Sequence, residues 1–114
     1  MLAKKFRLTG AKNFSGIQKE GIVYQSANFG IAYVNREDEN PSRFGFIVST
    51  KIAKDAVDRN RFKRAMSEAV RMASIDLKTG FDAVFLAKMS IVRVPTSEIM
   101  REVRVSLKGC GLSR

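Results

Sequence analysis

The sequence predicts an α+β fold in which one sheet packs against helices, with the element order α-β-β-β-α-β-α. Short apolar segments, the clearest at 28–35 with alternating side chains, occur before residue 50 and again at 81–89, and they are typical of strands. Residues 55–77 and 96–109 place apolar side chains at spacings of three and four, which is typical of helices lying on a sheet. A length of 114 residues fits one domain over 1–114 with a modest core.

The first half of the chain is expected to form an arm, one helix and three strands. Residues 1–10 are basic and predict an extended N-terminal arm, and residues 11–20 predict a short helix with Phe14 and Ile17 on one side. Strands are expected at 22–25, 28–35 and 43–50, the last apolar enough to be central in the sheet. The polar segment between the second and third strands contains an Asn-Pro pair and predicts a loop.

The second half is expected to form two helices separated by one strand. Asp55 is a good N-cap for the central helix, Asp58 three residues later resembles a capping box, and the apolar stripe runs to about Leu77. A strand follows at 81–89. The last helix is expected to be capped by Thr96 or Ser97 and to stop at Gly109.

The charge of the chain favours an acidic partner. Lys and Arg total 21 against 11 Asp and Glu, which gives a net charge of +10. Nucleic acid, an anionic membrane or an acidic protein could neutralise it. No run of about 18 apolar residues predicts a membrane span, and the N-terminus does not resemble a signal peptide, so we expect a cytoplasmic protein.

Catalytic side chains are not expected in this chain. It has no His, which is the usual general base near neutral pH, and its single Cys110 is interpreted as a free thiol without a role. The one acidic cluster, at 37–39, lies in a loop where successive side chains diverge, so neither a metal site nor an independent nuclease is predicted. No phosphate-binding glycine loop is present, and no small-molecule substrate is expected.

A basic cluster marks the start of the central helix. Residues 51–64, KIAKDAVDRNRFKR, hold six basic and two acidic residues. The helix dipole already makes this end positive, so the cations are costly there unless an anion binds them. Phosphates of a nucleic acid would satisfy them, and the alternative is a solvated basic face. The candidate RNA-binding residues are Lys51, Lys54, Arg59, Asn60, Arg61, Lys63, Arg64 and Arg71.

The segment 48–64, VSTKIAKDAVDRNRFKR, resembles the signature of the bacterial ribonuclease P protein subunit. The flanking segments RLTGAKNF at 7–14 and RFGFIVS at 43–49 resemble that family too, and the resemblance covers about residues 7–88 well and the final helix loosely. Ser67 departs from the pattern because the family often has Arg there, and Arg71 lies one turn further on as a candidate replacement. The matching residues in the signature are Val48, Ser49, Lys51, Arg59, Asn60, Arg61, Lys63 and Arg64.

This resemblance implies a fold like the second domain of a small-subunit ribosomal protein, with a left-handed βαβ crossover. It also implies partnership with a catalytic RNA that removes the 5′ leader from precursor tRNA, with Mg²⁺ bound mainly by the RNA. The family's leader cleft lies between the sheet and the first helix. Onto this chain it carries Phe14, Tyr33 and Ser49.

Two of these assignments have alternatives. Phe14 could equally be a core residue. Counting from Phe29 places Ala32 at the position of the family's cleft tyrosine, whereas a slip of one residue places Tyr33 there and flips the face.

The alternative function is that of a structural RNA-binding protein of ribosomal type, which would show the same charge and the same basic helix. DNA binding through a helix in a groove suits the sequence less, because no turn-helix pair is present.

Overall fold

The structure is a computed structural model that describes residues 2–8 and 11–114, without the side chains of 11–13, 15 and 18. Its strands are β1 (Ile22–Gln25), β2 (Phe29–Asn35), β3 (Arg43–Ile47) and β4 (Phe81–Ala87). Its helices are α1 (Ala11–Glu20), α2 (Ala56–Met72) and α3 (Thr96–Gly109), with short 3₁₀ turns at Lys4–Phe6, Ser74–Asp76 and Met89–Arg93. Apart from these turns, the element order is the predicted one.

The four strands form one mixed sheet in the order β1-β2-β4-β3. β1 and β4 each pair antiparallel with β2, whereas β3 pairs parallel with β4. β3 is therefore at an edge of the sheet, and the prediction that this strand is central was wrong. β3, α2 and β4 form the βαβ unit whose left-handed crossover the resemblance implies, and its hand stays a prediction.

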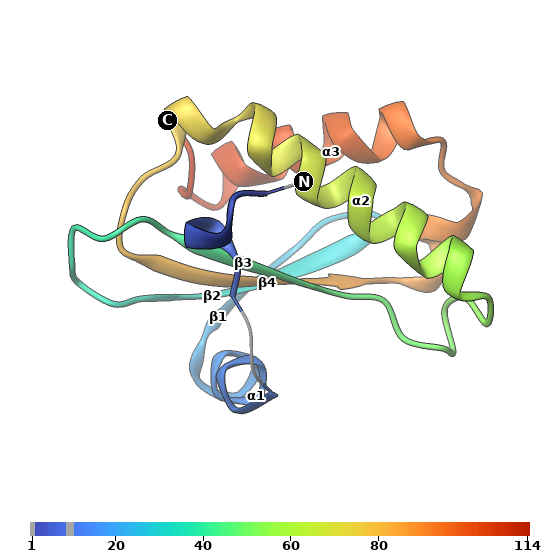
Figure 1. The fold of residues 1–114 in the computed structure, drawn as a ribbon, viewed down its shortest axis with the longest axis horizontal. Helices are drawn as coiled ribbons and strands as arrows, with labels where there is room; N and C mark the ends of the chain where they lie inside the picture. The colour runs from blue at the N-terminus through green and yellow to red at the C-terminus, as the bar shows by residue number, and fades with distance from the viewer. Residues whose placement is uncertain (1, 9–10) are drawn as a thin grey trace.

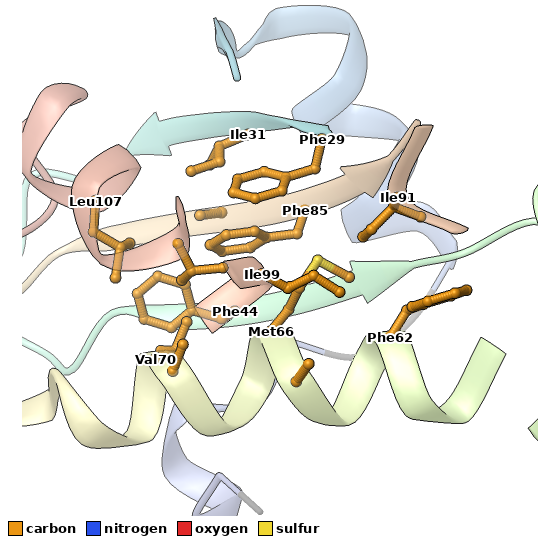
Figure 2. Packing of buried hydrophobic residues seen from close by; sticks show 14 of the residues in the cluster. Phe29, Ile31, Phe44, Phe62, Met66, Val70, Phe85, Ile91, Ile99 and Leu107 are labelled. Carbon is orange, nitrogen blue, oxygen red and sulfur yellow. The ribbon is translucent and has the colours of Figure 1, made fainter. Parts of the chain in front are cut away.

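The helices cover both faces of the sheet. α2 and α3 lie on one face and α1 lies on the other (Figure 1). The larger core fills the space under α2 and α3, where Phe29, Phe85 and Met66 are fully buried (Figure 2). A smaller cluster under α1 contains Leu8 and Ile17, together with Ala32 from β2 and Val84 from β4. The period-two alternation of β2 and β4 supplies both cores.

Several element ends differ from the predicted ones. β3 ends at Ile47, and α2 ends at Met72 because the chain tightens into the 3₁₀ turn that follows, as helix ends often do. Asp55 occupies the N-cap position of α2 but makes no side-chain cap hydrogen bond. α3 is preceded by Pro95 at its N-cap, so neither Thr96 nor Ser97 caps it, and it ends at Gly109 as predicted. Gly111 follows with a φ of 86°, in the left-handed region that favours glycine.

The N-terminal segment, residues 2–8, is docked rather than a free arm. Leu2 and Leu8 are buried, and Arg7 forms a parallel bridge with Phe44 of β3. The Leu8 N–H donates to the Phe44 carbonyl at 2.9 Å. The segment passes the edge of the sheet from the α2 side towards the α1 side (Figure 1). It thereby covers part of the hydrogen-bonding edge that β3 would otherwise expose.

None of the helices in the described part of the chain is long and apolar enough to cross a membrane.

Candidate nucleic-acid interface

The start of α2 and the loop before it carry a dense set of unneutralised cations. Lys51, Lys54, Arg61 and Arg64 are exposed, and Lys63 is half-buried. Within the described residues, none of these side chains forms an ion pair with a carboxylate. The structure therefore places accessible cations on both the loop and the helix end, whereas their binding to RNA stays a prediction.

Two arginines of this cluster have partners within the protein, which the sequence did not indicate. The Arg59 Nη1 group donates to the carbonyl oxygens of Ala53 and Lys54 at 2.9 and 2.7 Å. The Arg61 guanidinium lies 4.5 Å from the centre of the Phe62 ring, within the range of a cation–π contact, and its Nη1 reaches Thr96 Oγ1 at 3.4 Å.

Arg71 differs from the rest of the cluster because it forms an ion pair within the protein. Its Nε and Nη2 groups lie 2.7 and 2.5 Å from Glu68 Oε1, one turn back on α2. The pairing lowers the pKa of Glu68 below its ordinary value. Arg71 is thus already paired with a carboxylate, and its side chain does not line the pocket described below. The structure gives no support to Arg71 as the replacement for the family's arginine at Ser67.

A pocket of about 450 Å³ runs along the edge of β3, between the N-terminal segment, α1 and α2. It brings the half-buried aromatic Phe14 of α1 together with polar side chains of α2 that lie across the edge of the sheet. The sequence did not predict that the N-terminal segment or Phe46 would line this pocket. The N-terminal residues reach it only because residues 2–8 dock at the edge of β3. The lining residues are Leu2, Arg7, Leu8, Phe14, Phe44, Gly45, Phe46, Asn60, Lys63, Arg64 and Ser67.

The ring of Phe14 rests directly on β3 at Gly45. A Cβ atom at position 45 would lie 2.4 Å from Phe14 Cε1, so only glycine permits this approach. Phe14 also packs against the smaller core under α1. The two interpretations of Phe14 are therefore not exclusive, since one side of the ring packs in the core and the residue also lines the pocket.

Tyr33 is not brought together with Phe14. It packs on the opposite face of the sheet, with its ring centre 6.3 Å from that of Phe81, whereas its neighbour Ala32 faces α1. Burial, followed by the nearby Cys110, raises the pKa of Tyr33 above its ordinary value. The slip of one residue that would place Tyr33 in a cleft under α1 does not occur, and Ala32 occupies that position.

Ser49 is exposed just after β3 and does not line the pocket. Its carbonyl oxygen accepts hydrogen bonds from the backbone N–H groups of Ile52 and Ala53. In this structure, Ser49 therefore shapes the loop that carries Lys51 and Lys54.

Comparison with known proteins identifies the family of this chain. The family model described as ribonuclease P matches residues 2–111. The ribonuclease P protein component of Oleidesulfovibrio alaskensis is 33% identical over 117 residues, which cover 94% of this chain and 93% of the relative.

The chain belongs to the bacterial ribonuclease P protein family.

Other ribonuclease P proteins agree with this assignment. The protein component of Synechocystis is 26% identical over 111 residues, covering 97% of this chain and 90% of the relative. The solved structure of the Thermotoga maritima protein is 27% identical with a TM-score of 0.81, and it covers 90% of this chain and 96% of that one. The Staphylococcus aureus protein shares the fold, with a TM-score of 0.88 at 24% identity over 97% of this chain and 100% of that one.

Membership in the ribonuclease P protein family decides between the functions that the sequence left open. The chain is a protein component of the ribonuclease P endoribonuclease, which acts in tRNA processing, and this implies association with ribonuclease P RNA. A structural protein of ribosomal type would share the charge and the basic helix but not this family.

Proposed function

We propose that this protein binds the catalytic RNA of ribonuclease P through the start of α2 and guides the single-stranded 5′ leader of precursor tRNA along the pocket at β3. The observation that carries the proposal is the composition of this pocket, where Phe14 and Phe46 lie beside Asn60, Lys63 and Arg64. Aromatic rings can stack on unpaired bases while Lys and Arg contact the backbone, so this combination suits single-stranded RNA.

The two proposed roles, binding the catalytic RNA and binding the leader, belong to two different surfaces. Lys51, Lys54, Arg61 and Arg64 are exposed at the start of α2 and suit the phosphates of a large RNA. The pocket combines apolar and charged side chains, which suits the bases and the backbone of a single strand. Arg64 belongs to both surfaces and connects the RNA subunit to the substrate.

Mg²⁺ is proposed to be held mainly by the RNA partner. In the part of the chain that the structure describes, no three His, Cys, Asp or Glu side chains gather in an arrangement that could hold a metal ion. We derive no catalytic step through the protein's own side chains, and the role proposed for the chain is to bind and orient RNA.

The proposal is tested by reconstitution of the holoenzyme. The protein is mixed with a bacterial ribonuclease P RNA and 5′-labelled precursor tRNA at low Mg²⁺, and release of the leader is measured. We expect cleavage to depend on the protein and to fall for the variant K63A/R64A. The matched control is R104A/K108A, which removes the same two kinds of charge from exposed positions on α3. Tight RNA binding without stimulated cleavage would contradict the proposal.

A further inference from the structure

We propose that Arg59 is a positioning residue, which holds the loop of residues 49–55 against the start of α2 and so presents Lys51 and Lys54 to RNA. Its Nη1 group donates to two successive loop carbonyls, those of Ala53 and Lys54, at 2.9 and 2.7 Å. The effect on RNA binding rests on the proposed function, whereas the contact with the loop is independent of it.

Both hydrogens of this nitrogen are used within the protein. A guanidinium Nη atom carries two N–H groups, and here each has a carbonyl partner. Arg59 is half-buried, in contrast to Arg61 and Arg64 on the same helix. A phosphate that approaches this surface would therefore meet the loop lysines and the neighbouring arginines before it could bind this nitrogen.

Besides Arg59, the loop is held by hydrogen bonds within itself and by the packing of Ile52 and Ala53 in the core. The Ser49 carbonyl accepts from the N–H groups of Ile52 and Ala53 at 3.0 and 3.2 Å, and the side chain of Ala53 is buried. Asp55 follows at the N-cap of α2 but makes no side-chain cap hydrogen bond there. The Arg59 side chain thus adds two hydrogen bonds to the last loop residues, beside the bond that its backbone N–H donates to the Asp55 carbonyl at 3.1 Å.

The chemistry of arginine suits this task. Hydrogen bonds from a cation to carbonyl oxygens are stronger than neutral ones, and the planar guanidinium can serve two acceptors in a fixed geometry. The partial negative charge of the two carbonyls also offsets the repulsion between Arg59 and the loop lysines. A lysine at position 59 would keep the charge but lose this fixed arrangement of donors.

The first test is hydrogen exchange in the free protein, which needs no RNA. In R59A and R59K we expect the amides of Ile52, Ala53 and Arg59, or of the residue replacing it, to exchange about tenfold faster, as for local opening that loses one or two hydrogen bonds. The matched control R64A removes a charge from the same helix without touching the loop. Unchanged exchange of these amides in folded R59A and R59K would overturn the proposal.

The second test is a mutant cycle in binding to ribonuclease P RNA, with circular dichroism to show that each variant is folded. K51A/K54A should lower the slope of log affinity against log salt concentration by about two units. Adding R59A to this double variant should weaken binding by less than about twofold, because the effect of Arg59 on binding passes through the two lysines. A direct phosphate contact would instead lower the slope by about one more unit and add its full effect. That result would overturn the positioning role, whereas failure of the wild type to bind this RNA would overturn the proposed function alone.

Discussion

Phe14 combines packing and pocket-lining in one side chain. Its ring rests on Gly45 and contacts the small core under α1, and the residue also lines the pocket at β3. If a leader base stacks on this ring, F14A should weaken binding of precursor tRNA by about 1–3 kcal/mol. The measurement is the affinity of the holoenzyme for precursor tRNA, which carries the leader, and for mature tRNA, which lacks it. Only the affinity for precursor tRNA should fall.

The control for this prediction is F14L, which keeps apolar packing but removes the aromatic face. We expect F14L to be as folded as the wild type and still to bind the leader less tightly. Normal leader binding by F14L, together with unfolding of F14A, would assign Phe14 to the core alone.

Lys63 and Arg64 line the pocket and make no ion pair within the described residues. If each meets a phosphate, either single alanine variant should lower the slope of log affinity against log salt by about one unit. The measurement is binding at several salt concentrations, to ribonuclease P RNA for Arg64, and of the holoenzyme to precursor tRNA for Lys63, whose proposed partner is the leader. An unchanged slope would remove that residue from the interface.

At the level of elements, the N-terminal segment packs along the edge of the sheet at β3. Leu8 is buried at 3% exposure, and its backbone is bonded to β3. L8A should therefore destabilise the fold by about 2–5 kcal/mol, as other Leu-to-Ala changes in cores do. Urea denaturation measures this, with K5A at an exposed site of the same segment as the control. Equal stability of L8A and K5A would show that the segment does not dock in solution.

For the whole molecule, the acidic side chains that pair with arginine predict how stability depends on pH. Hydrogen bonds from Arg36 and Arg71 hold the pKa values of Asp38 and Glu68 below their ordinary values of 3.8 and 4.5. Because the folded state holds these protons less tightly than the unfolded state, the stabilisation is present above those ordinary values and is lost as the pH falls below them. Both pairs are exposed, so the contribution is small.

The measurement is urea unfolding at several pH values between neutrality and pH 3. The free energy of unfolding of the wild type should fall towards acid, and the variant D38N/E68Q should show a shallower fall. Identical pH dependence of the two proteins would mean that these ion pairs do not persist in solution.

Much of the fold could be predicted because it depends on local patterns. The spacing of apolar side chains determined the type and order of the main elements, and the charged segment at 51–64 marked the start of α2 as the basic surface. Both are properties of residues close together in the chain. The edge position of β3 could not be obtained in this way, because its apolar side chains are covered by α2 on one face and by α1 on the other, as those of a central strand would be. Its place in the sheet depends on which backbones pair, which side-chain hydrophobicity does not specify.

The sequence by itself thus determined the class of fold, the basic helix and the resemblance to ribonuclease P proteins. Only the tertiary structure decided that Ala32 rather than Tyr33 faces α1, that Phe14 shares a pocket with Asn60 and Lys63, and that Arg59 holds the preceding loop. The physical reason is that these features are not local patterns. Strand register and the docking of the N-terminal segment depend on contacts between residues distant in sequence, and the path of the loop depends on backbone geometry. A shift of one residue in register reverses the face of every side chain in a strand, and periodicity alone does not specify that register.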